Sequence, residues 1–235
     1  MAEARRTLMK KMMHKQGWHL LSLVVLLFAI WYGWEFLPQA QAGVLWGVGT
    51  SFWFWLAIAV PVIHQIYAVI FWRGELHTNW LSKSLGSKER AFKFFRAGFF
   101  PMLAARPVSI ILLSVANREQ LSLGLGWRIG IGIILFAGFA WMMYSVVHYF
   151  GMDTAAGRDH FYPEEYKGLA LEKRGIYRYV DNAMYSVGFF ILWFWGVIFA
   201  SPAALLAAAF NHAYIWVHWF TVEKPDMQAI YGGNS

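Results

Sequence analysis

The chain has 235 residues, of which 59% are hydrophobic and only 14% are charged. Soluble domains carry about 25% charged residues, so this composition excludes an ordinary soluble domain and indicates a membrane protein. The chain has no cysteine, which excludes disulfides, thiolate metal sites and cysteine nucleophiles. Its formal charge of +7 comes mostly from loops beside apolar runs, a pattern that favours anionic lipid headgroups over nucleic acid as partner.

Six apolar segments follow one another along the chain, and a helix needs about 20 such residues to cross a bilayer. We therefore expect an all-α fold, a polytopic transmembrane bundle with about six spans. Pro61 is expected to kink the second span, and the third span holds Arg106-Pro107. The segments run over about 18–37, 44–72, 99–116, 126–150, 184–200 and 203–221.

The first apolar segment has a competing interpretation as a cleaved signal peptide. Ala40-Gln41-Ala42 resembles a cleavage site. The run is long for a signal peptide, however, and it contains Glu35. A membrane span is therefore the favoured interpretation.

Basic residues predict how the spans are oriented. Sixteen Lys and Arg side chains lie in the N-terminal 17 residues and in the segments 73–96 and 151–183. Only two, Arg118 and Arg128, lie in the connections of the other side. Because Lys and Arg accumulate on the cytoplasmic side, we expect both termini in the cytoplasm, which six spans satisfy.

Two further features concern the surroundings of the spans. Gly130, Gly132 and Gly138 recur at close to helical spacing, which predicts a close-packed helix face. The polar stretch 151–182 contains aromatic residues, among them Phe161, and is either a segment lying on the membrane surface or a solvated loop.

The last sixty residues predict a helical hairpin that breaks at Ser201-Pro202. Its two open ends, 177–185 and 223–231, should lie close together on the cytoplasmic side. A carboxylate near the end of a span, such as Glu223, is costly unless it faces protein or water. The simpler interpretation is that Glu223 is solvated at the helix exit, with Lys224 available as a partner.

Three histidines lie within or near spans: His148, His212 and His218. His212 and His218 are six residues apart, which is not one helical face, and no HExxH motif occurs, so we expect no metal. Packing through interhelical hydrogen bonds is the expected role of such histidines. His148 is the exception, because it stands at the predicted cytoplasmic mouth.

The same residues resemble those of the integral-membrane methyltransferases that include phosphatidylethanolamine N-methyltransferase and isoprenylcysteine carboxyl methyltransferase. The segment 181–185 is similar to the Asp-Asn-Pro-Met-Tyr of the phospholipid enzymes, with Ala183 in place of proline. The segment 222–225 is similar to their closing Glu-Glu-Pro, with Lys224 in place of the second glutamate. The stretch 148–151 is similar to their Asp-Tyr-Phe-Gly. The resemblance covers about residues 136–232.

The resemblance implies a single methyltransferase domain over 1–235, with scaffold spans in 1–135 and a donor-binding core in 136–235. It implies S-adenosylmethionine as methyl donor and a membrane lipid as acceptor, most simply phosphatidylethanolamine or its mono- and dimethyl derivatives. Asp181-Asn182 stands where the carboxyl methyltransferases have Arg-His, which argues against that branch. The residues expected to bind the donor are Tyr177, Arg178, Asn182, Tyr185, Glu223 and Lys224.

The acceptor side and the competing functions complete these expectations. His148 and Tyr149 are expected to line the acceptor mouth, and His148 or Glu223 to take the proton of the amine. One alternative keeps the donor but methylates a prenylcysteine carboxylate or a small thiol. Another is a transporter or scaffold without catalysis, for which Arg106-Pro107 is the one fitting feature, since transporters place polar residues at mid-membrane.

Overall fold

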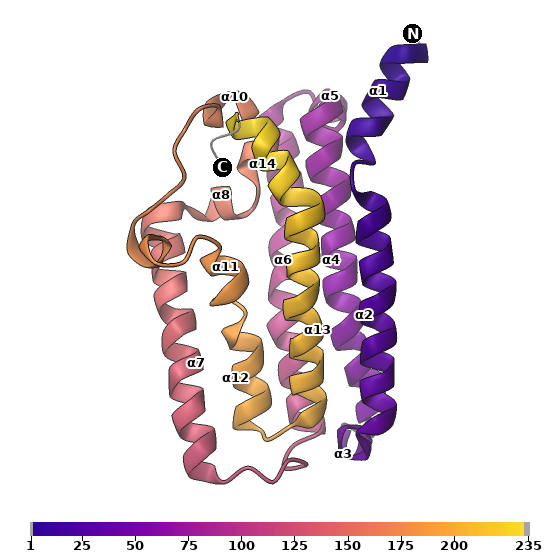
Figure 1. The fold of residues 1–235 in the computed structure, drawn as a ribbon, viewed down its shortest axis with the longest axis vertical. Helices are drawn as coiled ribbons and strands as arrows, with labels where there is room; N and C mark the ends of the chain where they lie inside the picture. The colour runs from indigo at the N-terminus through magenta and orange to yellow at the C-terminus, as the bar shows by residue number, and fades with distance from the viewer. Residues whose placement is uncertain (1, 233–235) are drawn as a thin grey trace.

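The computed structural model describes residues 2–232, and they form a bundle of long helices with short helices at one end (Figure 1). Strand content is limited to one two-stranded antiparallel hairpin in this part of the chain. The elements are α1 (Ala2–Met12), α2 (Gln16–Phe36), α3 (Pro38–Gln41), β1 (Val44–Leu45), β2 (Val48–Gly49), α4 (Thr50–Thr78), α5 (Trp80–Leu85), α6 (Lys88–Ala116), α7 (Leu125–Ser145), α8 (Met152–Ala155), α9 (Arg158–Phe161), α10 (Pro163–Tyr166), α11 (Ala183–Ser186), α12 (Phe190–Ile198), α13 (Pro202–His218) and α14 (Lys224–Tyr231), with π-helical turns at Val146–Phe150 and Trp219–Glu223 and a 3-10 turn at Gly175–Arg178.

Four helices are long and apolar enough to cross a membrane, which confirms the expected all-α membrane fold at this coarser level. They span Arg5–Phe36, Thr50–Thr78, Lys88–Ala116 and Leu125–Phe150. The predicted fifth span is instead divided into α11 and α12, and α12 has only 9 residues. At 1.5 Å per residue, α12 extends about 14 Å, roughly half of a bilayer core.

The division falls at Gly188. Its N–H bonds to the carbonyl of Ala183, five residues back, at 2.9 Å. A Cβ at Gly188 would lie 2.3 Å from the backbone oxygen of Met184, so only glycine fits here. Hydropathy could not reveal this break, because the apolar composition continues through it.

Two further boundaries differ from the sequence prediction. The second span begins at Thr50 and not at Val44, because residues 44–49 form the hairpin, with Trp46 and Gly47 both at positive φ. The predicted loop 73–96 is mostly helical, since α4 and α6 run on beyond the apolar stretch and α5 lies between them. Pro61 lies inside α4, which continues through it as one helix.

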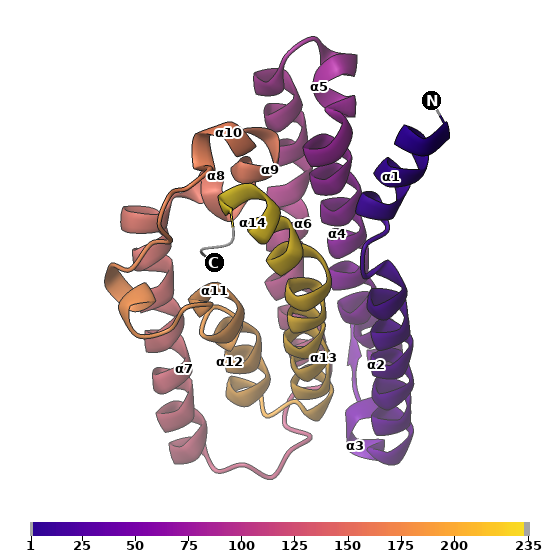
Figure 2. The ribbon, with the colours of Figure 1, turned by 45° about the horizontal axis from the view of Figure 1, so that its top comes forward.

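The two ends of the bundle differ in character. α1, α5, α10 and α14 lie at one end, and α3 lies at the other (Figures 1 and 2). The three basic regions of the chain therefore meet at one end of the molecule, as the counting of Lys and Arg requires. The stretch 151–182 covers this end with short helices, and Phe161 is fully buried in the core, so it is not available to the membrane surface.

The glycines of α7 form part of its contact with α12. A Cβ at Gly132 would lie 2.7 Å from Cδ1 of Ile198, and one at Gly138 would lie 3.0 Å from Phe190. The expected close-packed face is confirmed at these two positions. It is wrong for Gly130, where a Cβ would meet nothing within 4 Å.

Gly132→Leu should therefore force α7 and α12 apart, and we expect it to lower stability by about 1–3 kcal/mol, the range for overpacked sites. Thermal unfolding in detergent measures the effect. Gly130→Leu is the matched control in the same helix and should leave the melting temperature nearly unchanged. Equal effects of the two substitutions would contradict the packing described here.

Asn117 organises the other end of the bundle. Its Oδ1 accepts hydrogen bonds from Ser201 Oγ at 2.9 Å and from the Ala203 N–H at 3.0 Å. Its Nδ2 donates to the carbonyls of Gln39 and Ala42, both at 2.8 Å. Asn117 therefore joins the start of α13 to the connection after α2. Ser201 also caps α13 by accepting from the Ala204 N–H.

Asn117→Ala should leave these buried groups without partners, and we expect a loss of about 2–4 kcal/mol in unfolding free energy. Arg118→Ala, at the exposed neighbouring position, is the control and should change little. Chemical or thermal unfolding of the two variants in the same detergent tests the difference. Similar melting temperatures for Asn117→Ala and the wild type would rule out this role.

Candidate active site

A cavity of about 480 Å³ lies inside the bundle, enclosed by residues of α4, α6, α7, α8, α11, α12 and α13. Most of its wall is apolar, from Phe99 and Leu103 of α6 to Met142 of α7 and Ile215 of α13. Two apolar residues of the lining, Leu103 of α6 and Met152 of α8, are 40% and 37% exposed, so the cavity is not fully sealed by the described residues.

Tyr185 connects this cavity with the C-terminal end of the bundle. It lines the cavity from α11, and its hydroxyl donates a hydrogen bond to Oε2 of Glu223. The sequence prediction that these two residues meet is thereby confirmed. The solvated interpretation of Glu223 is wrong, because the side chain is half-buried and bonded to Tyr185 and not to Lys224.

The environment of Glu223 makes it titrate near neutral pH. Burial raises the pKa of its carboxyl to about 7, although the hydrogen bond from Tyr185 acts in the opposite direction. Tyr185 donates to Oε2 of Glu223, and the other oxygen, Oε1, accepts no hydrogen bond from any residue within 2–232. Glu223 therefore offers one open acceptor oxygen and a proton equilibrium suited to acid–base chemistry.

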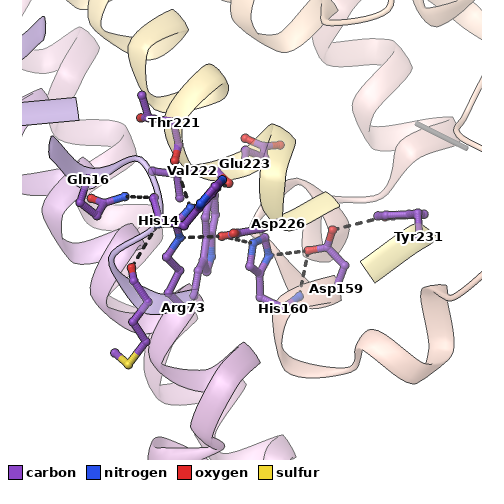
Figure 3. A network of polar contacts seen from close by, with 12 residues as sticks. His14, Gln16, Arg73, Asp159, His160, Thr221, Val222, Glu223, Asp226 and Tyr231 are labelled. Carbon is purple, nitrogen blue, oxygen red and sulfur yellow. Dashed lines mark hydrogen bonds and ion pairs between the residues drawn. The ribbon is translucent and has the colours of Figure 1, made fainter. Parts of the chain in front are cut away.

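A buried chain of alternating charges holds the helix that carries Glu223 (Figure 3). Arg73 of α4 donates from Nε to Asp226 Oδ2 at 3.1 Å, and from its terminal nitrogens to the carbonyls of Thr221 at 3.0 Å and His14 at 2.6 Å. His160 Nε2 lies 3.6 Å from Asp226 Oδ2. The Arg73 guanidinium thus anchors the π-helical turn 219–223 through its Thr221 carbonyl, and α14 through Asp226.

The chain of charges continues through the short helices of 151–166. His160 Nδ1 lies 2.8 Å from Asp159 Oδ1, and the Tyr231 hydroxyl donates to Asp159 Oδ2 at 3.3 Å. Trp72 stacks on the His160 ring, with centroids 4.6 Å apart. Burial disfavours the charged ring, but Asp159 and then Asp226 outweigh it and raise the pKa of His160 to about 10. His160 is therefore an imidazolium between two carboxylates.

The remaining residues expected at the site are spread more widely. Tyr177 is buried, stacks on Phe150 at 5.2 Å and packs behind the cavity wall with Met142. Asn182 is half-buried. Its backbone carbonyl accepts hydrogen bonds from the N–H groups of Tyr185 and Ser186. Arg178 and Lys224 are exposed.

The expected acceptor residues lie on α7's continuation and not at this cavity. His148 is exposed, stacks on Tyr144 at 4.1 Å and bonds through Nδ1 to the Tyr144 carbonyl at 3.0 Å. Tyr149 lies under the guanidinium of Arg174, 5.3 Å from its ring centroid. Neither side chain belongs to the lining of the cavity described above. Their assignment to an acceptor mouth stays a prediction.

The other two histidines differ from each other. His212 accepts a hydrogen bond from Trp193 Nε1 at 3.1 Å, which confirms a packing role between α12 and α13. His218 lines the cavity, and its Nδ1 has no partner among the described residues. No group of three metal-ligating side chains occurs within the described part of the chain.

The sequence prediction missed Arg73, Asp159, His160 and Asp226. One local signal existed, because Asp226 follows Glu223 by three residues and shares its helix face. The partner could not be inferred, since Arg73 stands 153 residues earlier.

Fold and site together define a predominantly helical membrane protein with an interior cavity and a titratable carboxylate that is hydrogen-bonded to a residue of the cavity lining. The family model for phospholipid methyltransferases matches residues 127–234, a little under half of the chain. The match confirms the resemblance drawn from the motifs, and it supports a methyltransferase that acts at a membrane. No curated protein and no solved structure matches the chain.

Proposed function

We propose that this protein is an S-adenosylmethionine-dependent methyltransferase that N-methylates phosphatidylethanolamine or its mono- and dimethyl derivatives. The observation that carries the proposal is the Tyr185–Glu223 pair, in which Tyr185 lines a mostly apolar cavity, within the segment that matches the family. The family match supports the phospholipid class. The choice of donor and of the particular headgroup is the proposal.

The residues present fit a methyl donor of this kind. Glu223 offers an open carboxylate oxygen that can accept hydrogen bonds from ribose hydroxyls or pair with an α-ammonium group. When bound, S-adenosylmethionine supplies an electrophilic methyl group on a sulfonium. We assign Glu223, Tyr185 and Asn182 to its binding, with Tyr177, Arg178 and Lys224 as further candidates from the motif, and the 136–235 segment as the donor-binding core.

The chain's own contribution to the reaction is positioning and proton removal. Methyl transfer is an in-line displacement, so holding the two reactants in register supplies much of the rate. Only a neutral amine can attack. A carboxylate that titrates near pH 7 can accept the proton that the amine loses. The apolar cavity excludes water from the attacking nitrogen.

The orientation forms part of the same proposal. We propose six passes, with α11–α12 and α13 as the C-terminal hairpin and both termini in the cytoplasm. The gathering of α1, α5, α10 and α14 at one end supports this arrangement. It brings Glu223 to the side on which a soluble donor is available.

Incubation of the purified protein with methyl-labelled donor and separate acceptors tests the function. We expect label in phosphatidylethanolamine and its methylated forms. Label in a prenylcysteine or a small thiol instead would move the assignment to those acceptors. Absence of label from every acceptor, with no donor binding by calorimetry, would contradict an enzymatic function.

A further inference from the structure

Two arginines are buried in this bundle, and their surroundings are opposite. Arg73 is 1% exposed and donates to one carboxylate and several backbone carbonyls. Arg106 of α6 is 4% exposed, yet its guanidinium makes no hydrogen bond or ion pair with any residue in 2–232, and its Nε is an unpartnered buried atom. The nearest compensation is the ring of Phe189, with its centroid 5.7 Å from Cζ.

Other unpartnered polar groups face the same cavity as Arg106. Both ring nitrogens of His64 and both amide atoms of Gln65 lack hydrogen-bond partners among the described residues, as does Nδ1 of His218. These side chains are 4%, 2% and 1% exposed, in that order. Buried polar groups without partners are rare and costly, so several on one cavity wall indicate a site that a ligand completes.

The chemistry of this cluster is that of an anion site. No Asp or Glu is among the described residues that line the cavity. A guanidinium and an amide NH2 converge on it, and His64 can add an N–H. An isolated charge in the membrane interior needs a partner of opposite sign, and guanidinium favours bidentate oxyanions such as phosphate or carboxylate.

The lining of the cavity favours a lipid as the source of that anion. Its wall is mostly apolar, and the lining residues Leu103 and Met152 are 40% and 37% exposed, which suits the entry of acyl chains. Glu223 is not part of the lining, but it accepts a hydrogen bond from Tyr185, which is. A buried cation in the cavity and a carboxylate next to it together complement a zwitterionic headgroup that carries both a phosphodiester and an amine.

We propose that Arg106, with Gln65 and His64, binds the phosphodiester of the lipid acceptor and so places its amine toward Glu223. This inference rests on the proposed function and adds the subsite that selects a phosphate-containing acceptor. Arg106 is here a specificity residue: it contacts the substrate at the phosphodiester, at a distance from the reacting atoms.

The test compares the wild type with Arg106→Gln, which keeps a polar side chain but loses the charge, and with Arg106→Lys. Calorimetry in detergent measures binding of dihexanoylphosphatidylethanolamine, of inorganic phosphate and of the methyl donor. Arg106→Gln should weaken binding of the short-chain lipid at least tenfold, Arg106→Lys should restore part of it, and donor affinity should not change. Methylation of dodecylamine, an amine without phosphate, should be equal in wild type and Arg106→Gln.

Ligand-free stability supplies a second measurement. Since Arg106 is an uncompensated charge without ligand, Arg106→Gln should melt at or above the wild-type temperature, and the short-chain lipid should raise the melting temperature of the wild type only. A lower melting temperature of ligand-free Arg106→Gln would assign a structural role and overturn the proposal.

Three other results would also overturn it: unchanged lipid binding by Arg106→Gln, a loss of donor affinity instead, or binding of inorganic phosphate without binding of the lipid. Failure of the proposed function looks different. In that case the wild type would methylate no acceptor, while charge-dependent binding of the phosphodiester would still be measurable.

Discussion

Glu223→Gln should reduce methyl transfer by about 10²-fold or more, the usual contribution of a positioned proton acceptor. Glutamine keeps the shape of the side chain and can still accept from Tyr185, but it cannot take a proton. Since the pKa of Glu223 lies at about 7, the wild-type rate should rise with pH through this value. The variant should lack this limb of the profile. Initial rates between pH 5.5 and 8.5 measure both effects.

The same substitution should have the opposite effect on stability. The folded-state pKa of Glu223, about 7, is above the ordinary value of 4.5, so the fold favours the protonated form. The corresponding stability is present below pH 4.5 and is lost as pH rises to about 7. Ligand-free Glu223→Gln should therefore be at least as stable as the wild type at pH 8. Glu89→Gln, on the exposed start of α6, is the control. Full activity of Glu223→Gln with an unchanged pH profile would refute the role.

Asp226→Ala should be the most destabilising single change at the charged end of the bundle. The substitution leaves Arg73 and His160 buried without the carboxylate that faces both of them. Breaking a buried ion pair in this way lowers the free energy of unfolding by about 3–5 kcal/mol. Arg73 is 2% and Asp226 5% exposed in its side chain. Asp153→Ala is the matched control, because Asp153 also pairs with an arginine but is 45% exposed. Exposed pairs contribute about 0–1 kcal/mol.

The pH dependence of stability separates His160 from Glu223. The pKa of His160 in the fold, about 10, is above the ordinary 6.5, so its contribution is complete below pH 6.5 and is lost as pH rises toward 10. The wild-type melting temperature should therefore fall across this window, and His160→Gln should show a smaller fall. Parallel curves for the two proteins would show that the ring is not charged in the fold.

The sequence predicted the Tyr185–Glu223 contact because local patterns were sufficient for it. Two apolar runs on either side of Ser201-Pro202 must return the chain, and the polar residues then meet at the open ends. The helices of 73–96 were not predictable in this way. Hydropathy ends where charges begin, whereas the backbone hydrogen bonds of α4 and α6 continue through the charged residues.

The Arg106 cluster illustrates a second limit. Arg106-Pro107 was visible in the sequence as a polar interruption of an apolar run, but composition does not tell which way a side chain points. In the structure it lines a cavity shared with α4, about forty residues earlier, where His64 and Gln65 also have no partners within residues 2–232. Such a site depends on long-range packing, so only coordinates reveal it.

The guanidinium of Arg73 also forms hydrogen bonds with the N-terminal segment of the chain. Its Nη1 donates to the backbone oxygens of Met12 and His14, while its other nitrogens hold the turn before α14. A truncation ahead of Gln16, or a fusion that displaces this segment, would therefore not be neutral. Loss of those two oxygens would loosen the arginine, and with it the position of Glu223, which stands 209 residues after His14 in the chain. Recombinant versions are best labelled at an internal exposed position.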